Sequence, residues 1–470
     1  MAELTEGVRT LLGDQRKSII TLAIPIAVAL FVQHFNNIVD SFWVADLGKN
    51  AIAALGIIYP LYSILLGIGN GLGIGVSAAI ARSIGMKNHN DANGVAVQGL
   101  ILTVIVSAVV TLILLASSEQ AILLMGGETL LHDCLSYGLP IFMGAVFIIL
   151  NGVMVGMLLG EGSAKRAMVI QVTGALTNII LDPIMIYWMD MGIAGAAWAT
   201  MISFVVSSMI PFYWYLKAKD TFVRFERKHF VFDVRLQKEI LHVGLPEAVE
   251  LSVMNFFNIF LNMFVLICAG TGGLAVYTLV WRIGYLTLIP ALAMSGAMVS
   301  ACSAEYGMKR FDMIRDAYRF TIKRSFIWLV ALNLILALSA WTLADVFIRT
   351  EDLAYMHDEM IYFTWLMAVF MPFFSMTFVG SALMQSVKKA AHAMANTLTR
   401  NIILTISYWV VSITLCSLSG IGLALIVVEG LGGAAMLIHG RIVLDRVIRE
   451  NGSEPVRAPN TNIHTPFGIR

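Results

Sequence analysis

Long apolar runs separated by short polar segments repeat along the whole chain. A bilayer crossing takes about 20 apolar residues, and runs of that length recur about twelve times. We expect crossings at 18–45, 51–84, 95–117, 135–159, 165–189, 192–216, 239–268, 273–303, 319–344, 360–386, 390–416 and 420–445. Composition agrees, because 58% of the residues are hydrophobic and only 13% are charged, against about 25% charged in soluble domains. The pattern predicts an all-α polytopic membrane protein with twelve transmembrane helices.

Basic residues gather in alternate loops. Arg82 and Lys87 follow the second run, and Lys309 and Arg310 follow the eighth. The intervening loops carry mainly acidic residues such as Asp46. Since loops rich in Lys and Arg stay in the cytoplasm, this alternation predicts a multi-pass plasma-membrane protein with both termini cytoplasmic.

The longest polar loop divides the chain into halves of six runs each, and the halves resemble each other. Lys17–Pro25 is similar to Lys238–Pro246, and Gly85–Lys87 matches Gly307–Lys309. A repeat of this kind predicts two parallel bundles related by an axis along the membrane normal, with a site between them, as in transporters. The predicted divisions are an N-terminal bundle at 1–216, a cytoplasmic loop at 217–238, a C-terminal bundle at 239–445 and a cytoplasmic tail at 446–470.

A carboxylate lies deep in the first run. Gln33, Asn37 and Asp40 are spaced four and three residues apart, so they share one helix face. A charged side chain at this depth costs roughly 2.5–3.5 kcal/mol on insertion, so it needs a partner, a proton or an ion. We therefore expect a cavity around this face.

The fifth run carries a second carboxylate. Asn178 and Asp182 lie one turn apart and are followed by Pro183, which leaves a helix carbonyl without its usual donor. Thr200 in the sixth run adds a hydroxyl group. With Asp40 these side chains form an oxygen-rich set that suits Na⁺ or a proton rather than zinc or copper. The residues leave the choice between the two ions open.

Two interpretations of the aspartates remain at this stage. If Asp40 and Asp182 lie close together, their repulsion favours protonation of one of them, and that group can bind and release a proton. Alternatively, both are held permanently by Asn and Thr donors in a structural network. Two buried acids without a nearby Lys or Arg favour the functional interpretation.

The second half lacks both aspartates, because Leu261 and Thr405 stand at the equivalent positions. Its acids leave structural and transport roles open. Glu247 suits the N-terminus of a helix, Glu250 lies about one turn deeper and can reach the cavity, and Glu429 stands in a glycine-rich run.

We interpret several other residues within the membrane runs as structural. Arg282 is the basic residue placed deepest in the membrane, and we expect a tie to an acid or a carbonyl. The run Gly67–Gly75 predicts a close-packing helix face. The residues with expected structural roles within the membrane are Pro25, Pro183, Arg282 and Glu429.

Several motifs, in order along nearly the whole chain, resemble the multidrug and toxic compound extrusion (MATE) family, specifically its DinF-like prokaryotic and archaeal branch. They are Ile24-Pro25, Gln33 with Asn37–Asp40, Gly71–Gly75, Ala79–Arg82, Leu159–Gly162, Asn178–Pro183, Gly195–Thr200 and Trp281–Ile283. The resemblance implies a V-shaped pair of six-helix bundles. It also implies export of amphiphilic, mostly cationic compounds in exchange for Na⁺ or H⁺ by alternating access.

The resemblance also implies site residues. The ion-coupling positions present here, which would ligate Na⁺ in a sodium-coupled protein, are Asp40, Asn178, Asp182 and Thr200. The expected substrate cavity comprises Gln33, Asn36, Asn37, Asn151, Glu250 and Asn255. Asn36 stands where relatives can carry tyrosine. Asn255 matches a glutamate used by other branches, so that role is not carried over.

The expected partners are small amphiphilic or cationic molecules, Na⁺ or H⁺ and the lipid bilayer, with no nucleic acid and no cofactor besides the coupling ion. Both halves of the cavity lie on one chain, which predicts a monomer. An enzyme is not expected, because no nucleophile–base pair, HExxH motif or paired metal ligands occur in or near a run. A flippase for a lipid-linked precursor is the alternative, although it requires a cationic cavity. A receptor or an uncoupled channel fits the two-bundle repeat less well.

Overall fold

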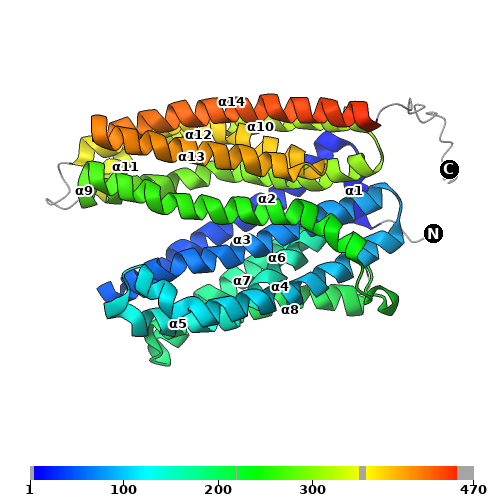
Figure 1. The fold of residues 1–470 in the computed structure, drawn as a ribbon, viewed down its shortest axis with the longest axis horizontal. Helices are drawn as coiled ribbons and strands as arrows, with labels where there is room; N and C mark the ends of the chain where they lie inside the picture. Colours follow the sequence, from blue (N-terminus) through cyan, green and yellow to red (C-terminus); the bar gives the residue numbers. More distant parts are fainter. Residues whose placement is uncertain (1–4, 219, 349–355, 452–470) are drawn as a thin grey trace.

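The computed structural model describes residues 5–218, 220–348 and 356–451, and this part of the chain is helical apart from its connecting segments (Figure 1). The first set of helices is α1 Glu6–Leu11, α2 Gln15–Ala45, α3 Lys49–Gly85, α4 His89–Leu124, η1 Glu128–Leu130, α5 Leu131–Met143, α6 Ala145–Gly160, α7 Ala164–Pro183, η2 Ile184–Trp188, α8 Gly192–Phe212 and η3 Tyr213–Ala218. After η4 Arg227–His229 follow α9 Val234–Gly307, α10 Phe311–Leu338, α11 Ala340–Phe347, α12 His357–Ser386, α13 Ala390–Thr414 and α14 Leu418–Asn451.

Nine helices of the described residues are long and apolar enough to cross a membrane, or ten if the bent pair α5 and α6 forms one span. Two features separate this number from the twelve expected crossings. The 74 residues of α9 contain two of them, joined at Gly270, whose φ of 65° and ψ of −167° are not helical. With 25 residues, α13 is also long enough but is not among the apolar helices counted. The prediction of an all-α polytopic membrane protein is confirmed.

The helices form two bundles that lie side by side, α2–α8 and α9–α14, here called the first and second bundle (Figure 1). The N-terminal helix and the end of α14 lie at the same end of the molecule, here called the terminal end. There one hydrophobic core joins both bundles, with Ile84 of α3 in the same cluster as Ala304 of α9. Toward the opposite, far end the core separates into one cluster around Phe142 and another around Phe370. The bundles are therefore joined at the terminal end and have separate cores at the far end.

The contact between the bundles at the terminal end has two-fold character. A Cβ atom on Gly85 would lie 2.0 Å from the carbonyl oxygen of Ala304, and a Cβ atom on Gly307 would lie 2.3 Å from that of Arg82. The two pairs are related by the same offset along the sequence. The sequence repeat thus corresponds to a repeated backbone contact that leaves no space for a side chain.

The glycine run of α3 forms a close-packing face, as predicted. A Cβ atom on Gly73 would lie 2.3 Å from the carbonyl oxygen of Gly152 on α6. Small residues at such positions allow two helix backbones to approach directly. This contact fixes α3 against α6 inside the first bundle.

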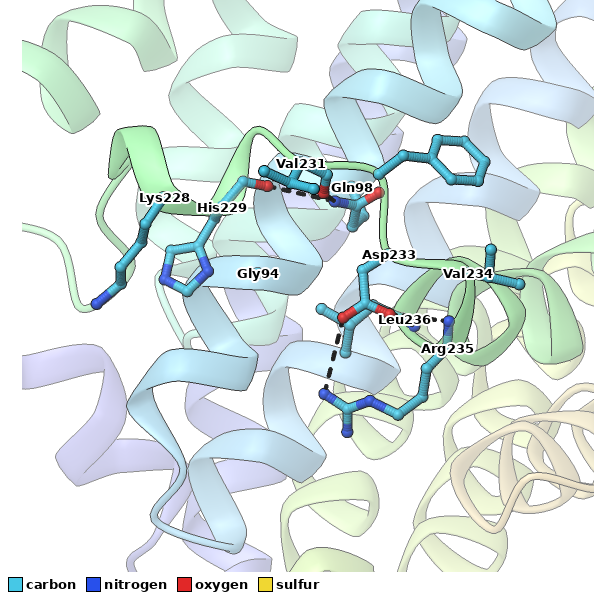
Figure 2. A pocket seen from close by; sticks show the side chains of 10 residues that line it. Gly94, Gln98, Lys228, His229, Val231, Asp233, Val234, Arg235 and Leu236 are labelled. Atoms are coloured by element: carbon cyan, nitrogen blue, oxygen red, sulfur yellow. Dashed lines mark hydrogen bonds and ion pairs between the residues drawn. The ribbon is translucent and has the colours of Figure 1, made fainter.

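The segment that links the bundles folds back onto α4 (Figure 2). The amide of Gln98 donates hydrogen bonds to the carbonyls of His229 at 3.3 Å and Val231 at 2.7 Å. The Arg235 guanidinium donates two more to Asp91, at 2.8 and 3.1 Å. The linker is therefore bound to the first bundle at the terminal end.

Candidate functional site

Local breaks in helix geometry position the polar residues of the first bundle. The α-helix α7 ends at Pro183, and the chain continues as the π-helical turn η2, because proline has no N–H group to continue the α-helical ladder. Gly195 of α8 allows a direct approach to this turn, since a Cβ atom there would lie 2.6 Å from the carbonyl oxygen of Met185. This approach sets Thr200 of α8 beside the last turns of α7.

Asn178 is the centre of the resulting hydrogen-bond network. Its Oδ1 accepts a hydrogen bond from Asn36 of α2 at 2.9 Å. Its Nδ2 donates to Asp182 Oδ1 at 3.0 Å and, more weakly, to Thr200 Oγ1 at 3.4 Å. One amide therefore links three helices and orients one oxygen of the Asp182 carboxyl group.

Asp40 of α2 and Asp182 of α7 face each other. Asp182 is fully buried and Asp40 is half-buried, and the two carboxyl groups lie close enough to interact electrostatically. Two carboxylates this close repel each other, and a proton or a cation held between them relieves that repulsion. Within the described residues, Asp40 Oδ1 and Asp182 Oδ2 have no hydrogen-bond partner, and neither acid forms an ion pair with a basic side chain. The geometry therefore suits a shared proton or a bound cation.

The other expected cavity residues do not join this network. Asn151 is buried and donates to Ser207 Oγ at 2.8 Å within the first bundle. Asn255 donates to a carbonyl of its own helix, that of Leu251, at 3.0 Å. Gln33 is half-buried and Asn37 is exposed on α2, whereas Asn36 belongs to the network directly.

The acids of the second bundle have partners of their own. Glu429 forms an ion pair with Arg400 at 2.7 Å, with side-chain exposures of 1% and 6%. The Arg400 guanidinium also lies over the Phe374 ring, 5.4 Å from its centroid. Glu250 accepts a hydrogen bond from Thr397 at 2.8 Å. The ion pair with Arg400 fits a structural role, which was one of the two roles expected for Glu429.

Sequence reasoning missed one fully buried acid outside the membrane-spanning helices. Glu161 follows α6 and accepts hydrogen bonds from the Tyr215 hydroxyl at 3.2 Å and from the backbone N–H groups of Phe222 and Val223 at 3.0 and 3.2 Å. Burial raises the pKa of this carboxyl group to about 7, against the opposing effect of those donors and of Arg166. A glutamate between two glycines directly after an apolar run was the available signal.

Comparisons with known proteins agree on one family. The MatE family model matches residues 25–184 and 246–427, which include both aspartates. The multidrug export protein MepA of Staphylococcus aureus (strain NCTC 8325 / PS 47) is 26% identical over 251 residues, 53% of this chain and 55% of MepA. The match thus spans about half the length of that curated relative.

Solved structures match over almost the whole chain. The crystal structure of MATE in complex with MaL6 has a TM-score of 0.91 and 31% identity, covering 95% of this chain and 100% of that one. The outward-facing conformation of a multidrug resistance MATE family transporter of the MOP superfamily has a TM-score of 0.90 and 30% identity, covering 95% and 99%.

Proposed function

Because this chain belongs to the MatE family of membrane transporters, we propose that it is a multidrug efflux antiporter of the DinF-like branch. It exports amphiphilic, mostly cationic compounds in exchange for Na⁺ or H⁺. The observation that carries this proposal is the pair formed by the half-buried Asp40 and the fully buried Asp182, which lie close together and have no basic partner among the described residues. An acid pair of this kind can exchange a cation for a proton or for another cation.

The mechanism we propose is alternating access. The separate cores at the far end leave the bundles free to part there, while the shared core closes the terminal end. A proton or Na⁺ that binds at Asp40 and Asp182 removes negative charge from the cavity and weakens its attraction for a cationic compound. The compound leaves, the bundles rock, and the ion is released on the other side. Coupling arises because ion and substrate favour different charge states of one site.

We further propose that the terminal end is cytoplasmic. Basic residues such as Arg82 and Arg315 lie at this end of their helices, as the positive-inside rule requires. We also propose that the chain divides into bundles at 1–216 and 239–445, which are joined by a linker at 217–238. Most of the predicted tail at 446–470 lies outside the described residues. A monomer is proposed because both bundles belong to one chain.

The test uses purified protein in liposomes and a cationic fluorescent dye, rhodamine 123. A Na⁺ gradient and a pH gradient are imposed separately on wild-type protein and on the Asp40→Asn variant. The control is Asp46→Asn, which removes an exposed carboxylate from the same stretch of chain just beyond α2. We expect one gradient to drive dye movement in wild type and in the control but not in Asp40→Asn.

Wild-type transport by Asp40→Asn would refute the proposed coupling site. No movement under either gradient in wild type would contradict antiport of cationic compounds and favour the flippase, which would then be assayed with lipid-linked substrates.

A further inference from the structure

Where the two bundles meet, here called the seam, lies an arginine side chain that has no ion-pair or hydrogen-bond partner among the described residues. Arg282 lies in the second half of α9, about 14 Å along the helix from Gly273. Within residues 5–218, 220–348 and 356–451, its exposed guanidinium forms no ion pair and donates no hydrogen bond to a side chain or carbonyl. A charge inside a membrane protein usually faces a partner or a water-filled cavity. The described part of the chain thus does not contain the tie to an acid or a carbonyl that we expected for this side chain.

Contacts with α2 and α3 place Arg282 opposite the first bundle. His34 of α2 donates from Nε2 to the main-chain carbonyl of Arg282 at 3.1 Å. The same imidazole ring stacks on Tyr285, with centroids 4.9 Å apart and planes inclined by 17°. Tyr59 of α3 lies close enough to Arg282 to interact with its charge. The guanidinium therefore lies near His34 of α2 and Tyr59 of α3 in the first bundle.

The acid pair lies along the same seam. Asp40 is on the same helix as His34, about 9 Å further along its axis. Tyr62 of α3 is an electrostatic neighbour of both Asp40 and Tyr59. The seam thus carries the acid pair on the first bundle and an arginine on the second bundle. Two tyrosines of α3 link them as electrostatic neighbours.

We propose that Arg282 binds the anionic group of zwitterionic amphiphiles, whose cationic group lies toward Asp40 and Asp182. This proposal rests on the export function proposed above and specifies its substrate class. A guanidinium offers two parallel donors that match a carboxylate, and the pair is strong where water is limited. The substrate then supplies the partner that Arg282 lacks among the described residues. A purely cationic compound gains no contact from Arg282 and is repelled by it. The residue therefore determines specificity between zwitterionic and purely cationic substrates.

The test compares two dyes that differ by one methyl group. Rhodamine 110 carries a free carboxylic acid, and rhodamine 123 is its methyl ester. Their export is measured in proteoliposomes under the gradient that drives wild-type protein. Arg282→Gln is expected to lower rhodamine 110 export about tenfold or more, the effect of losing a charge-assisted hydrogen bond, and to leave rhodamine 123 export within about twofold. Arg282→Lys keeps the charge but not the paired donors, so it retains part of the rhodamine 110 activity.

Arg319→Gln serves as the control, because it removes an exposed arginine of α10; both dyes should move as in wild type. Equal loss of both dyes in Arg282→Gln would show a structural tie and overturn the proposal. Unchanged export of rhodamine 110 would overturn it as well.

The measurements are repeated in liposomes of phosphatidylcholine alone and with phosphatidylglycerol. If the effect of Arg282→Gln is the same for both dyes and appears only with phosphatidylglycerol, the partner is the headgroup of an anionic lipid and the proposal is wrong. If wild-type protein exports rhodamine 123 but not rhodamine 110, the proposal also fails while the proposed antiport stands. Absence of rhodamine 123 export in wild type refutes the antiport itself.

Discussion

Replacing Glu161 with glutamine should remove the pH dependence of a contact between the linker and the first bundle. The Glu161 side chain is fully buried and receives the backbone N–H groups of Phe222 and Val223. Burial raises its pKa from about 4.5 to about 7, so the docked linker favours the protonated acid. Glutamine has nearly the same shape and does not ionise in this range.

The magnitude follows from the shift in pKa. A group whose pKa is higher in the docked state than in the undocked state stabilises docking fully below the undocked value. That stabilisation declines as the pH rises from about 4.5 to about 7, by about 3 kcal/mol in total at 1.36 kcal/mol per unit. Between pH 5 and pH 8 the docking equilibrium should therefore weaken between tenfold and one-hundredfold, by about 2 kcal/mol.

Hydrogen exchange of the linker amides measures this directly. Protection of the segment 220–226, corrected for the intrinsic exchange rate at each pH, should fall between pH 5 and pH 8 in wild type and stay flat in Glu161→Gln. Glu119→Gln removes an exposed carboxylate of α4 and should follow wild type. A variant at Glu161 with the same pH dependence as wild type would refute the assignment of the titration to this residue.

Two further predictions concern packing and buried charge, both measured by thermal unfolding of purified protein in detergent. Gly73→Ala should destabilise the fold by about 1–3 kcal/mol through overpacking against Gly152, whereas Gly56→Ala on the same helix meets nothing within 4 Å and should be neutral or stabilising; equal stability of the two variants would contradict this packing. Glu429→Gln leaves Arg400 buried without its acid and should cost about 3–5 kcal/mol. A double variant that also carries Arg400→Gln should recover part of that loss, and no recovery would argue against the pair.

Much of the candidate site was accessible from the sequence because membrane insertion makes polar residues informative. Asp40, Asn178, Asp182 and Thr200 stand out in apolar runs, and the structure brings all four together. Asn36 was found only through the family resemblance, although its side chain donates directly to Asn178.

Pairings across the fold were not accessible from the sequence. Glu429 and Arg400 lie on different helices, α14 and α13, and nothing in their spacing along the chain indicates the contact. Glu161 gave a local signal, but its burial depends on Phe222 and Val223 in the distant linker. Such contacts depend on how helices pack, which periodicity and composition do not specify.

The helices, their membrane-spanning character and the repeat could be predicted from the order of the residues alone. Apolar length and backbone hydrogen bonding leave few alternatives to a helix in a bilayer. Which polar groups meet became visible only in the packed bundles, where Asp40 lies beside Asp182 and Arg282 has no acid partner among the described residues. The physical reason is that side-chain pairing in three dimensions depends on helix rotation and close backbone approach, such as that of Gly73 to Gly152. Those are properties of the packed bundles rather than of any single helix.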